Sequence, residues 1–313
     1  MSDLVTNFDL SEEQEMIRDT VRQFAREVIA PGAAHADEHK KLNEAAWDGM
    51  VELCLPGLPF SEEWGGAGFD NLSYSIAVEE ISRVCGSMGL TLAAHVSLGT
   101  WPIYAFGSQA LKERYLPGLC SGEFMGAYAL TEPGAGSDSA STQTTAVLDG
   151  DEYIINGAKC FTTNGSYSKC FVITVQTDPE LGSKGIMAMV IDRDQPGCII
   201  EPGEEKLGMR GSDWVNLVFQ DCRVPKDAVL GEEGEGFATF MKTLEGGRIS
   251  IAALSLGTAQ GALDQALAYS SEREQFGMPL NKHQAVAFKL ADMETEIQAA
   301  RHMVYHASRL KDA

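Results

Sequence analysis

The spacing of apolar residues constrains the fold of this 313-residue chain more than any other feature, because it changes twice along the sequence. In residues 1–123 apolar positions recur at helical intervals. Residues 124–235 contain short runs rich in Ile, Val, Phe and Thr between turn residues, which is typical of strands. Helical intervals return in residues 236–313. This order predicts an α+β protein with an N-terminal all-helical domain, a middle antiparallel β domain and a C-terminal helical bundle.

The first helix has clear start and stop signals. Ser11 and Gln14 form a predicted capping box, and Pro31 marks the predicted end of the helix. The face expected to point to the core consists of Ile17, Val21, Phe24 and Val28. The segment NEAAWDGMVELC predicts a second helix, whose buried side consists of Trp47, Met50 and Cys54.

The middle domain is predicted from turn signals and β-rich runs. Asn156-Gly157 and Asn164-Gly165 lie between such runs, and Asn-Gly pairs favour tight hairpin turns. Further strands are predicted in CFVITVQT, GIMAMVID and WVNLVFQDCRVP.

Two long apolar stripes follow Gly236. The first consists of Phe237, Met241, Leu244, Ile251 and Leu254, and the second of Val286, Leu290, Met293, Ile297, Ala300 and Val304. Their spacing of three and four residues is typical of long helices packed in a bundle, linked here by EREQFGMPLNKHQ. The pattern is interrupted at Ala313, so we expect the last helices of the bundle to be absent from this chain.

Charge and cysteine usage exclude several classes of function. The chain has 45 acidic and 24 basic residues, a net charge of -21, which disfavours nucleic acid and anionic membranes as partners. No apolar run is long enough to span a bilayer, and MSDLVTNFDL lacks the features of a targeting peptide, so we expect a cytoplasmic protein. The seven cysteines are scattered without a CxxC spacing, which predicts reduced, mostly buried thiols and no zinc site.

Arg248 is the first candidate functional residue. It lies four residues after Leu244, so the apolar stripe predicts that it faces the core, where an unpaired guanidinium would be costly. Glu245 is the candidate for a structural ion pair. Gly246 and Gly247 suggest instead that something bulky approaches the helix backbone, because each glycine inside a helix costs roughly 1 kcal/mol relative to alanine. A structural pair and a ligand clamp both remain open.

The loop LTEPGAGSDS at residues 130–139 is the second candidate. Its glycines would let backbone N–H groups approach a ligand, although Gly, Pro, Ser and Asp also make ordinary turns. On composition alone an ordinary turn is the simpler interpretation. This loop lacks the strand–loop–helix context of a dinucleotide fingerprint, and GEEGEG at 231–236 fits such a fingerprint even less well because its carboxylates would repel phosphate.

The remaining motifs predict no chemistry. Two histidine pairs, His35/His39 and His302/His306, have the helical spacing that metals use, but neither forms an HExxH motif. We expect no metal site at either pair. Ser137 lacks the context of a nucleophile elbow, which disfavours a hydrolase.

Taken together, the motifs resemble those of the acyl-CoA dehydrogenases, especially the short-chain, butyryl-CoA-oxidising members. The resemblance rests on YALTEPGAGSD, GDEYIINGAKCFTTNG, VFQDCRVPKDAVLGEEGEGF, LEGGRISIAALSLGTAQGALDQALAYSSEREQFGMPL and HQAVAFKLADM, which occur in the family's order from about residue 8 onward. It implies FAD as cofactor, an acyl-CoA substrate, an electron-transfer flavoprotein as acceptor and a homotetramer built as a dimer of dimers.

The resemblance also implies which residues form the site. The residues expected to contact the flavin are Tyr128, Leu130, Thr131, Gly136, Ser137, Phe161, Thr162 and Thr163, and those expected to contact the FAD of a neighbouring subunit are Arg273, Phe276 and Gln284. The residues expected to contact acyl-CoA are Ser137, Glu245, Gly246, Gly247 and Arg248. In this interpretation the 130–139 loop is a cofactor cradle, and CoA is the partner of Arg248.

The implied reaction is α,β-dehydrogenation, in which a carboxylate removes the α-proton of the thioester while hydride passes from the β-carbon to the flavin. In most of the family the base is a glutamate near the C-terminus, here expected beyond Ala313. In isovaleryl-type relatives it immediately precedes the arginine that matches Arg248, and this position is Gly247. We therefore expect the chain to be part of a longer polypeptide. A natural truncation without turnover, or Glu245 as a relocated base, are the alternatives.

Substrate choice is only loosely constrained. By analogy GSMGLTLAAHVSLGT lies near the acyl pocket and offers His95 but no Lys or Arg, which disfavours a dicarboxylic acyl group. Short straight acyl chains are the leading prediction, and branched or cyclic ones are the alternative. A non-catalytic flavin- or CoA-binding scaffold and an acyl-CoA oxidase are the competing functions, and the physiological direction stays open.

Overall fold

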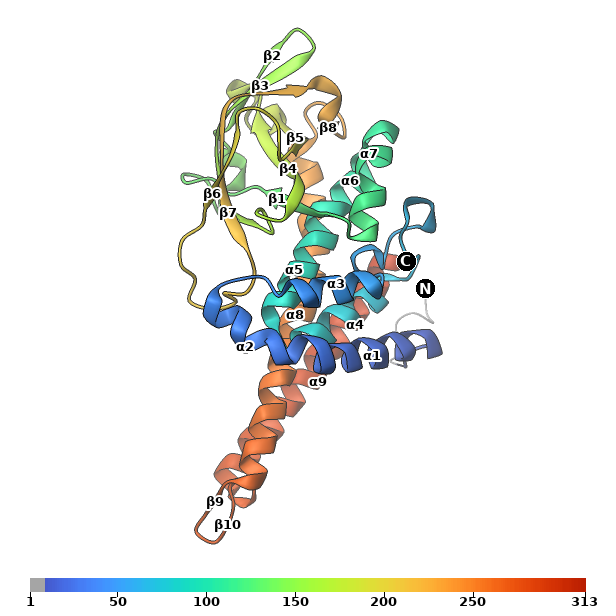
Figure 1. Cartoon of the computed structure of the whole chain (residues 1–313), viewed down its shortest axis with the longest axis vertical. Helices are drawn as coiled ribbons and strands as arrows, with labels where there is room; N and C mark the ends of the chain where they lie inside the picture. The colour runs from blue at the N-terminus through green and yellow to red at the C-terminus, as the bar shows by residue number, and fades with distance from the viewer. Residues whose placement is uncertain (1–8) are drawn as a thin grey trace.

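The computed structural model describes residues 9–313 and consists of a helical N-terminal part, a β domain and a projecting helical hairpin (Figure 1). Residues 1–8, and with them the predicted absence of a targeting peptide, lie outside the described residues. The α-helices of the N-terminal part are α1 (Glu12–Phe24), α2 (Ala30–His39), α3 (Glu44–Glu52), α4 (Asn71–Ser82), α5 (Gly86–Ala94), α6 (Trp101–Phe106) and α7 (Gln109–Ser121). Two π-helical segments, η1 (Ala25–Ile29) and η4 (His95–Thr100), join α1 to α2 and α5 to α6, and short 3₁₀ turns cover Leu55–Gly57 and Glu62–Trp64.

The capping box of the first helix is confirmed, but its predicted end is wrong. The Gln14 backbone N–H donates to Ser11 Oγ at 3.2 Å, and the Ser11 backbone N–H donates to Gln14 Oε1 at 3.0 Å. The helical path continues past Pro31, because the wider π turn of η1 precedes it and absorbs the missing N–H donor. The same turn shifts the helical phase, so Ile29 is buried whereas Val28 is 41% exposed.

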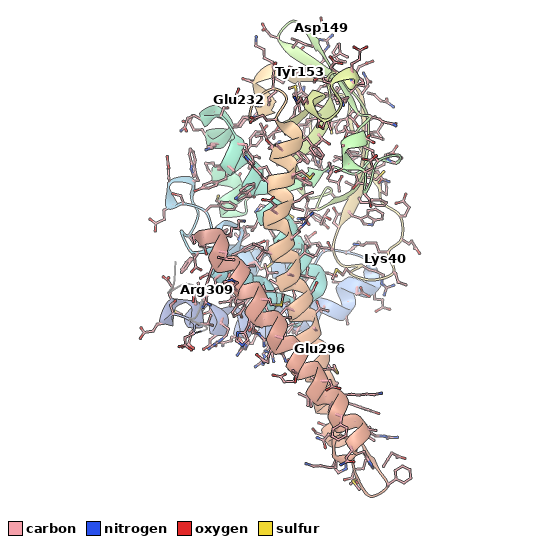
Figure 2. All side chains as sticks on the ribbon, turned by 180° about the vertical axis from the view of Figure 1, so that it is seen from behind. Lys40, Asp149, Tyr153, Glu232, Glu296 and Arg309 are labelled. Atoms are coloured by element: carbon pink, nitrogen blue, oxygen red, sulfur yellow. The ribbon has the colours of Figure 1, made fainter. Side chains whose placement is uncertain are left out.

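The β domain is one twisted sheet with the order β6-β7-β3-β2-β4-β5-β8, and β1 pairs with β4. Its strands are β1 (Met125–Ala129), β2 (Thr145–Asp149), β3 (Glu152–Thr163), β4 (Ser168–Gln176), β5 (Ile186–Asp192), β6 (Cys198–Pro202), β7 (Trp214–Pro225) and β8 (Val229–Leu230), with 3₁₀ turns at Ser139–Ser141, Pro179–Gly185 and Lys226–Ala228. The sheet is mostly antiparallel, as predicted. The pairings of β1 and β2 with β4 are parallel. Figure 2 shows Asp149 and Tyr153 at the outer end of this domain.

One of the two predicted hairpin turns is wrong. Asn164-Gly165 lies in the turn between β3 and β4, as predicted. Asn156-Gly157 instead lies inside β3, where the register with β7 shifts and Gly157 adopts φ 147°. A Cβ at Gly157 would lie 2.7 Å from Thr144 Cα, so glycine is needed for a close approach of two strands.

The C-terminal part is a long helical hairpin. Helix α8 (Gly236–Glu272) runs from the β domain past α4 and α5 to a tip formed by β9 (Glu274–Gln275) and β10 (Met278–Pro279), and a 3₁₀ turn (Leu280–Lys282) leads into α9 (Gln284–Asp312) (Figure 1). The stripe predicted for α9 is confirmed at Leu290, Ile297 and Val304, which are buried. Helix α9 ends against the start of α4, where the Asp312 carboxylate accepts from the Asn71 backbone N–H at 3.0 Å.

The stripe predicted for α8 is confirmed at Leu254, which is buried, but its phase is wrong at Ile251. Ile251 is 42% exposed, and the buried face consists mostly of small residues, among them Gly246, Gly247, Ser250, Ala253 and Gly257. A Cβ on Gly257 would collide with the carbonyl oxygen of Glu79 on α4. Helix α8 therefore approaches the backbone of α4 at its small residues, while Phe240, Leu254, Leu256 and Leu263 are its large buried side chains.

The core has two parts on opposite faces of the sheet. Along β4, Cys170 and Val172 belong to the core shared with the helices, whereas Phe171, Ile173 and Val175 belong to the core inside the β domain. This alternation is the expected period of two for a strand buried on both faces. The seven cysteines are free, with Cys54 the exposed one, in contrast to its predicted burial beside Trp47.

Candidate functional site

Two of the predicted flavin segments lie side by side at the end of β1. The backbone N–H of Cys160 donates to the carbonyl oxygen of Thr131 at 2.7 Å, which joins the loop at 130–137 to the segment Phe161–Thr163 at the end of β3. Tyr128 precedes the loop on β1, and its ring stacks on Phe240 of α8 with a centroid distance of 4.4 Å. The β domain and α8 therefore meet beside this loop.

The segment Phe161–Thr163 presents an aromatic surface. Phe161 is 58% exposed and stacks on Trp214 at 4.9 Å between ring centroids. Its φ of 60° is unusual for a bulky residue. Such a conformation costs about 1–3 kcal/mol and persists where the surrounding structure imposes it, often at functional sites.

The pair of segments fits an aromatic, polar cofactor such as FAD. Thr162 is fully buried, and its Oγ1 has no hydrogen-bond partner within the described part of the chain. Gly136 and Ser137 are exposed, and a Cβ on Gly136 would meet no atom closer than Thr131 Cγ2 at 4.0 Å. The loop thus leaves room for a ligand on its outer side.

A buried ion pair supports this loop from beneath, and sequence reasoning missed it. The ammonium group of Lys159 on β3 donates to Glu132 Oε1 at 2.6 Å, to Thr174 Oγ1 at 2.9 Å and to the carbonyl oxygen of Leu130 at 3.3 Å. The Lys159 side chain is fully buried and the Glu132 side chain is 4% exposed. A lysine within an apolar strand was the available signal, although its partner lies 27 residues away in the sequence.

Of the residues predicted to bind acyl-CoA, Ser137 lies in the loop and the other four lie on α8, and one prediction about these four is wrong. Glu245 and Arg248 are exposed, whereas Gly246 and Gly247 are buried. Arg248 therefore does not face the core, and among residues 9–313 it forms no ion pair with Glu245. The phase error in the α8 stripe explains the mistake, because Arg248 was placed on the face of Leu244 and Ile251.

Protein atoms fill the space over both glycines. A Cβ on Gly246 would lie 2.6 Å from Nζ of Lys311, and a Cβ on Gly247 would lie 3.0 Å from Cδ2 of Leu98. The Lys311 ammonium also lies 5.4 Å from the centre of the Trp101 ring. The glycine pair therefore lies under the side-chain ends of Lys311 and Leu98, and it gives no independent sign of a ligand.

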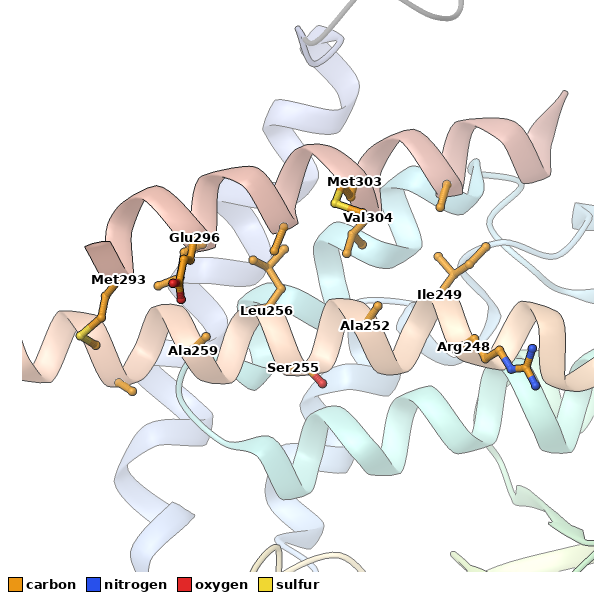
Figure 3. A pocket seen from close by; sticks show the side chains of 14 residues that line it. Arg248, Ile249, Ala252, Ser255, Leu256, Ala259, Met293, Glu296, Met303 and Val304 are labelled. Carbon is orange, nitrogen blue, oxygen red and sulfur yellow. The ribbon is translucent and has the colours of Figure 1, made fainter. Parts of the chain in front are cut away.

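Arg248 lies at one end of an apolar groove of about 860 Å³ between α8 and α9. Figure 3 shows its guanidinium extending from α8, while Met293 and Glu296 of α9 mark the opposite end. Most of the remaining lining side chains are Ala, Leu, Ile, Val and Met. The groove is separate from the aromatic surface at Phe161.

Arg273, Phe276 and Gln284 lie apart from the other predicted flavin residues. They belong to the exposed tip of the helical hairpin, at the opposite end of the molecule from the β domain (Figure 1). Phe276 is 91% exposed, with φ 53°. Within one chain the structure does not bring these three residues to the loop at 130–137.

The histidines have structural surroundings. His95 is fully buried, with Nε2 3.0 Å from the carbonyl oxygen of Leu119, and its Nδ1 accepts from the Gly126 backbone N–H at 3.2 Å. Burial lowers the pKa of His95 to about 4, so the ring is neutral at pH 7. His35 and His39 stack on each other at 3.9 Å, and the described residues contain no cluster of three or more metal-ligating side chains. No helix in that part of the chain is long and apolar enough to cross a membrane.

The chain matches the family models for the acyl-CoA dehydrogenase N-terminal, middle and C-terminal domains over residues 11–123, 127–222 and 234–313. It is 48% identical to a short-chain specific acyl-CoA dehydrogenase of Clostridium acetobutylicum over 307 residues, covering 98% of this chain and 81% of the relative.

Solved structures give the same assignment. Butyryl-CoA dehydrogenase from Megasphaera elsdenii superposes with a TM-score of 0.93 at 40% identity, over 96% of this chain and 79% of the other. A chain from a study of the electron transferring flavoprotein of Acidaminococcus fermentans superposes with a TM-score of 0.96 at 47% identity. The match covers 98% of this chain and 80% of the other. Acyl-CoA dehydrogenase complexed with FAD from Bacillus anthracis superposes with a TM-score of 0.91 at 33% identity. The match covers 97% of this chain and 52% of the other. The chain belongs to the acyl-CoA dehydrogenase family, flavoprotein oxidoreductases of fatty acid metabolism that act on acyl-CoA.

Proposed function

We propose that this chain carries out FAD-dependent α,β-dehydrogenation of a short-chain acyl-CoA to the trans-2-enoyl-CoA. The observation that carries the proposal is the junction of the 130–137 loop with Phe161–Thr163, where an exposed aromatic ring lies beside a loop whose glycines have open space around them. The similarity to a relative complexed with FAD supports this cofactor. Short acyl chains are favoured by the likeness to short-chain specific and butyryl-CoA dehydrogenases.

In this proposal each segment holds a different part of FAD. Tyr128, Leu130, Thr131, Gly136 and Ser137 would run along the flavin and offer backbone and hydroxyl groups to it, and Phe161–Thr163 would form the segment at its edge. Bound FAD supplies the acceptor for the hydride that leaves the β-carbon. Arg273, Phe276 and Gln284 contact the FAD of a second copy, since they lie at the far tip of their own chain. This arrangement implies a homo-oligomer, proposed as a tetramer.

The acyl-CoA binds along α8 in the same proposal. Arg248 is an exposed cation on a chain of net charge -21, so it is a suitable contact for the anionic CoA arm. Glu245 and Ser137 complete the proposed substrate contacts, while Gly246 and Gly247, predicted as contacts from the resemblance, are covered by Lys311 and Leu98 and would contribute only after those side chains move. Hydrogen bonds to the thioester carbonyl would acidify the α-proton, which is the electrostatic task of such a site.

Glu245 is not the proposed base that takes the α-proton. Its side chain is exposed, two positions before Gly247, and two positions correspond to a rotation of about 200° around a helix. We assign this role to no residue among those that the structure describes. A Glu245→Gln variant should therefore behave as the wild type, and a loss of turnover in it would contradict this assignment.

The proposed electron acceptor is an electron-transfer flavoprotein. Support comes from the 47% identity to a chain from a study of such a flavoprotein. An acyl-CoA oxidase, which passes electrons to oxygen, is the alternative. Rapid peroxide formation during aerobic turnover would favour the oxidase.

The decisive experiment is an anaerobic titration of the FAD-loaded protein with butyryl-CoA, following the oxidised flavin absorption band. Bleaching would show that FAD, substrate and a working base are present together. A band that shifts without bleaching would mean that acyl-CoA binds but the α-proton is not removed. A protein that fails to retain FAD, or a band that does not respond, would contradict the proposal. Isobutyryl-, hexanoyl- and cyclohexanecarbonyl-CoA, compared by kcat/KM, test the preference for short straight chains.

A further inference from the structure

The buried ion pair of Glu132 and Lys159 connects the main parts of the proposed flavin site. The pair lies directly beneath the 130–137 loop, and it is the only ion pair in the described chain with both side chains less than 5% exposed. Most other pairs have at least one partner that is well exposed, and the helical junction pair Glu79–Arg301 leaves its arginine 17% exposed. Both charges of the Glu132–Lys159 pair are therefore removed from water more completely than those of the other ion pairs in the described part of the chain.

Every donor of the lysine is used. An ammonium group has three N–H donors, and those of Lys159 reach Glu132, Thr174 and the carbonyl oxygen of Leu130. Leu130 is the first residue of the loop. The ammonium therefore fixes the direction of a peptide group at the point where the chain leaves β1.

The Glu132 carboxylate fixes the backbone that follows the loop. Glu132 accepts from the backbone N–H groups of Gln143 at 2.6 Å and Thr144 at 3.1 Å, immediately before β2 begins. Its own backbone N–H donates to the carbonyl oxygen of Ala135 at 2.9 Å, within the loop. Through these hydrogen bonds the pair links both ends of the segment between β1 and β2, at Leu130 and at Gln143–Thr144, to Lys159 of β3 and Thr174 of β4.

Fold stability alone does not call for this pair. Taking two charges out of water is expensive, and well-packed apolar side chains often stabilise a protein as much as a buried ion pair does. The gain that apolar side chains could not reproduce is the set of hydrogen bonds to the loop backbone. Burial raises the pKa of Glu132, but Lys159 and the two backbone donors outweigh it and leave the pKa lowered, so the carboxylate is charged at pH 7.

We propose that Glu132 and Lys159 are positioning residues that hold the 130–137 loop against Phe161–Thr163 in the geometry that binds the flavin. They do so through the backbone at Leu130, Gln143 and Thr144, without touching the cofactor. The inference rests on the proposed FAD-binding function of the loop. It predicts that the two roles of the pair, in stability and in flavin binding, can be separated by mutation.

The test compares Glu132→Gln, Lys159→Met and the double variant E132M/K159M with the wild type. Three quantities are measured on the full chain: the urea midpoint of the apo protein, amide hydrogen exchange at Gln143 and Thr144, and the Kd and visible spectrum of bound FAD. Lys169→Met is the matched control. It removes a lysine on β4 that is 47% exposed and pairs with Asp194 at 3.0 Å.

The double variant gives the decisive result. We expect its urea midpoint to lie above those of the single variants, because neither charge is left buried without a partner, and below that of the wild type, because the backbone N–H groups of Gln143 and Thr144 lose their acceptor. We also expect faster exchange at Gln143 and Thr144, an FAD Kd raised at least about tenfold through loss of the charged hydrogen bonds, and an altered flavin spectrum. The control should keep the wild-type values of all three quantities.

The failures are distinguishable. A double variant that binds FAD with the wild-type Kd and spectrum overturns the positioning role and leaves the pair purely structural. If a single variant does not fold, the double variant, which leaves no charge buried without a partner, still tests whether the loss of the pair weakens FAD binding. A wild-type chain that binds no FAD contradicts the proposed function itself, and the positioning role fails with it.

Discussion

The loop at 130–139 and the helical stretch Glu245–Arg248 both contain closely spaced glycines, yet the space around them differs. In the loop, a Cβ on Gly136 would meet its nearest neighbour at 4.0 Å, and one on Gly134 would meet Gln143 at 3.8 Å. In the helix, Lys311 and Leu98 occupy the corresponding space. Glycine therefore leaves open space for a ligand in the loop, whereas in α8 the space beside glycine is occupied by other side chains of the protein.

The comparison extends to what holds each region in place. Helix α8 is held by direct backbone approach to α4, where a Cβ on Gly257 or Gly261 would collide with a carbonyl oxygen. The loop has exposed glycines and depends on the buried Glu132–Lys159 pair beneath it. Substitutions in α8 should therefore change stability, and substitutions on the open side of the loop should change binding.

The largest effect is expected from Gly257→Ala in α8. The new Cβ would collide with the Glu79 carbonyl oxygen, which belongs to a helix backbone and has little freedom to move. Overpacking of this kind should lower the free energy of unfolding by about 3 kcal/mol, more than the roughly 1 kcal/mol that alanine gains as a helix former. Urea denaturation followed by far-UV circular dichroism measures the change.

Gly208→Ala is the control for this prediction. Gly208 lies in an irregular segment of the β domain, and a Cβ there would meet no atom within 4 Å. It should leave the free energy of unfolding within about 0.5 kcal/mol of the wild type. Equal stability of Gly257→Ala and the wild type would break the comparison, because α8 would then tolerate side chains where its backbone meets α4.

A second effect is expected from His95, in the closely packed region where η4 meets β1. Its pKa is about 4 in the folded protein because burial disfavours the charged ring, against about 6.5 in an unfolded chain. Between these values the unfolded state binds more protons, so stability is complete above pH 6.5 and falls as the pH decreases. The loss attributable to His95 should be about 2 kcal/mol between pH 6.5 and 5.

His95→Gln provides the test of that pH dependence. A glutamine amide can still donate to the Leu119 carbonyl oxygen and accept from the Gly126 N–H, but it does not titrate. Urea denaturation at pH 5, 6 and 7 should show a shallower acid loss in the variant. Identical slopes in the two proteins would mean that His95 does not carry the acid sensitivity.

Much of the fold could be predicted because local signals and tertiary structure agree over most of the chain. The capping box at Ser11, the strand at Trp214–Pro225 and the buried face of α9 follow from capping, β-propensity and apolar spacing. The errors arose where one signal serves two structures. Asn156-Gly157 satisfies a hairpin turn and a strand bulge equally well, and Pro31 ends a regular helix but is accommodated after a π turn.

The candidate site was less predictable from the residues alone. Apolar spacing reports large side chains, so it placed the inner face of α8 one step away from the small residues that are buried there, and Arg248 was turned inward as a result. The family resemblance selected the 130–137 loop. It did not indicate the support from Glu132 and Lys159, because the two residues are far apart in sequence and meet only when β1 and β3 are adjacent.

The smallest effect in energy, and the one that sharpens the comparison most, is expected from Gly136→Ala. The glycine has an ordinary backbone conformation and open space around it, so alanine should leave the free energy of unfolding within about 0.5 kcal/mol of the wild type. The added methyl group would stand on the surface that approaches the flavin in the proposed site. We expect the FAD Kd to rise about tenfold, which corresponds to about 1.4 kcal/mol, as measured by fluorescence titration. Gly208→Ala again serves as the control. A variant that lost stability instead would show that the open side of the loop is packed in solution, and the contrast with α8 would disappear.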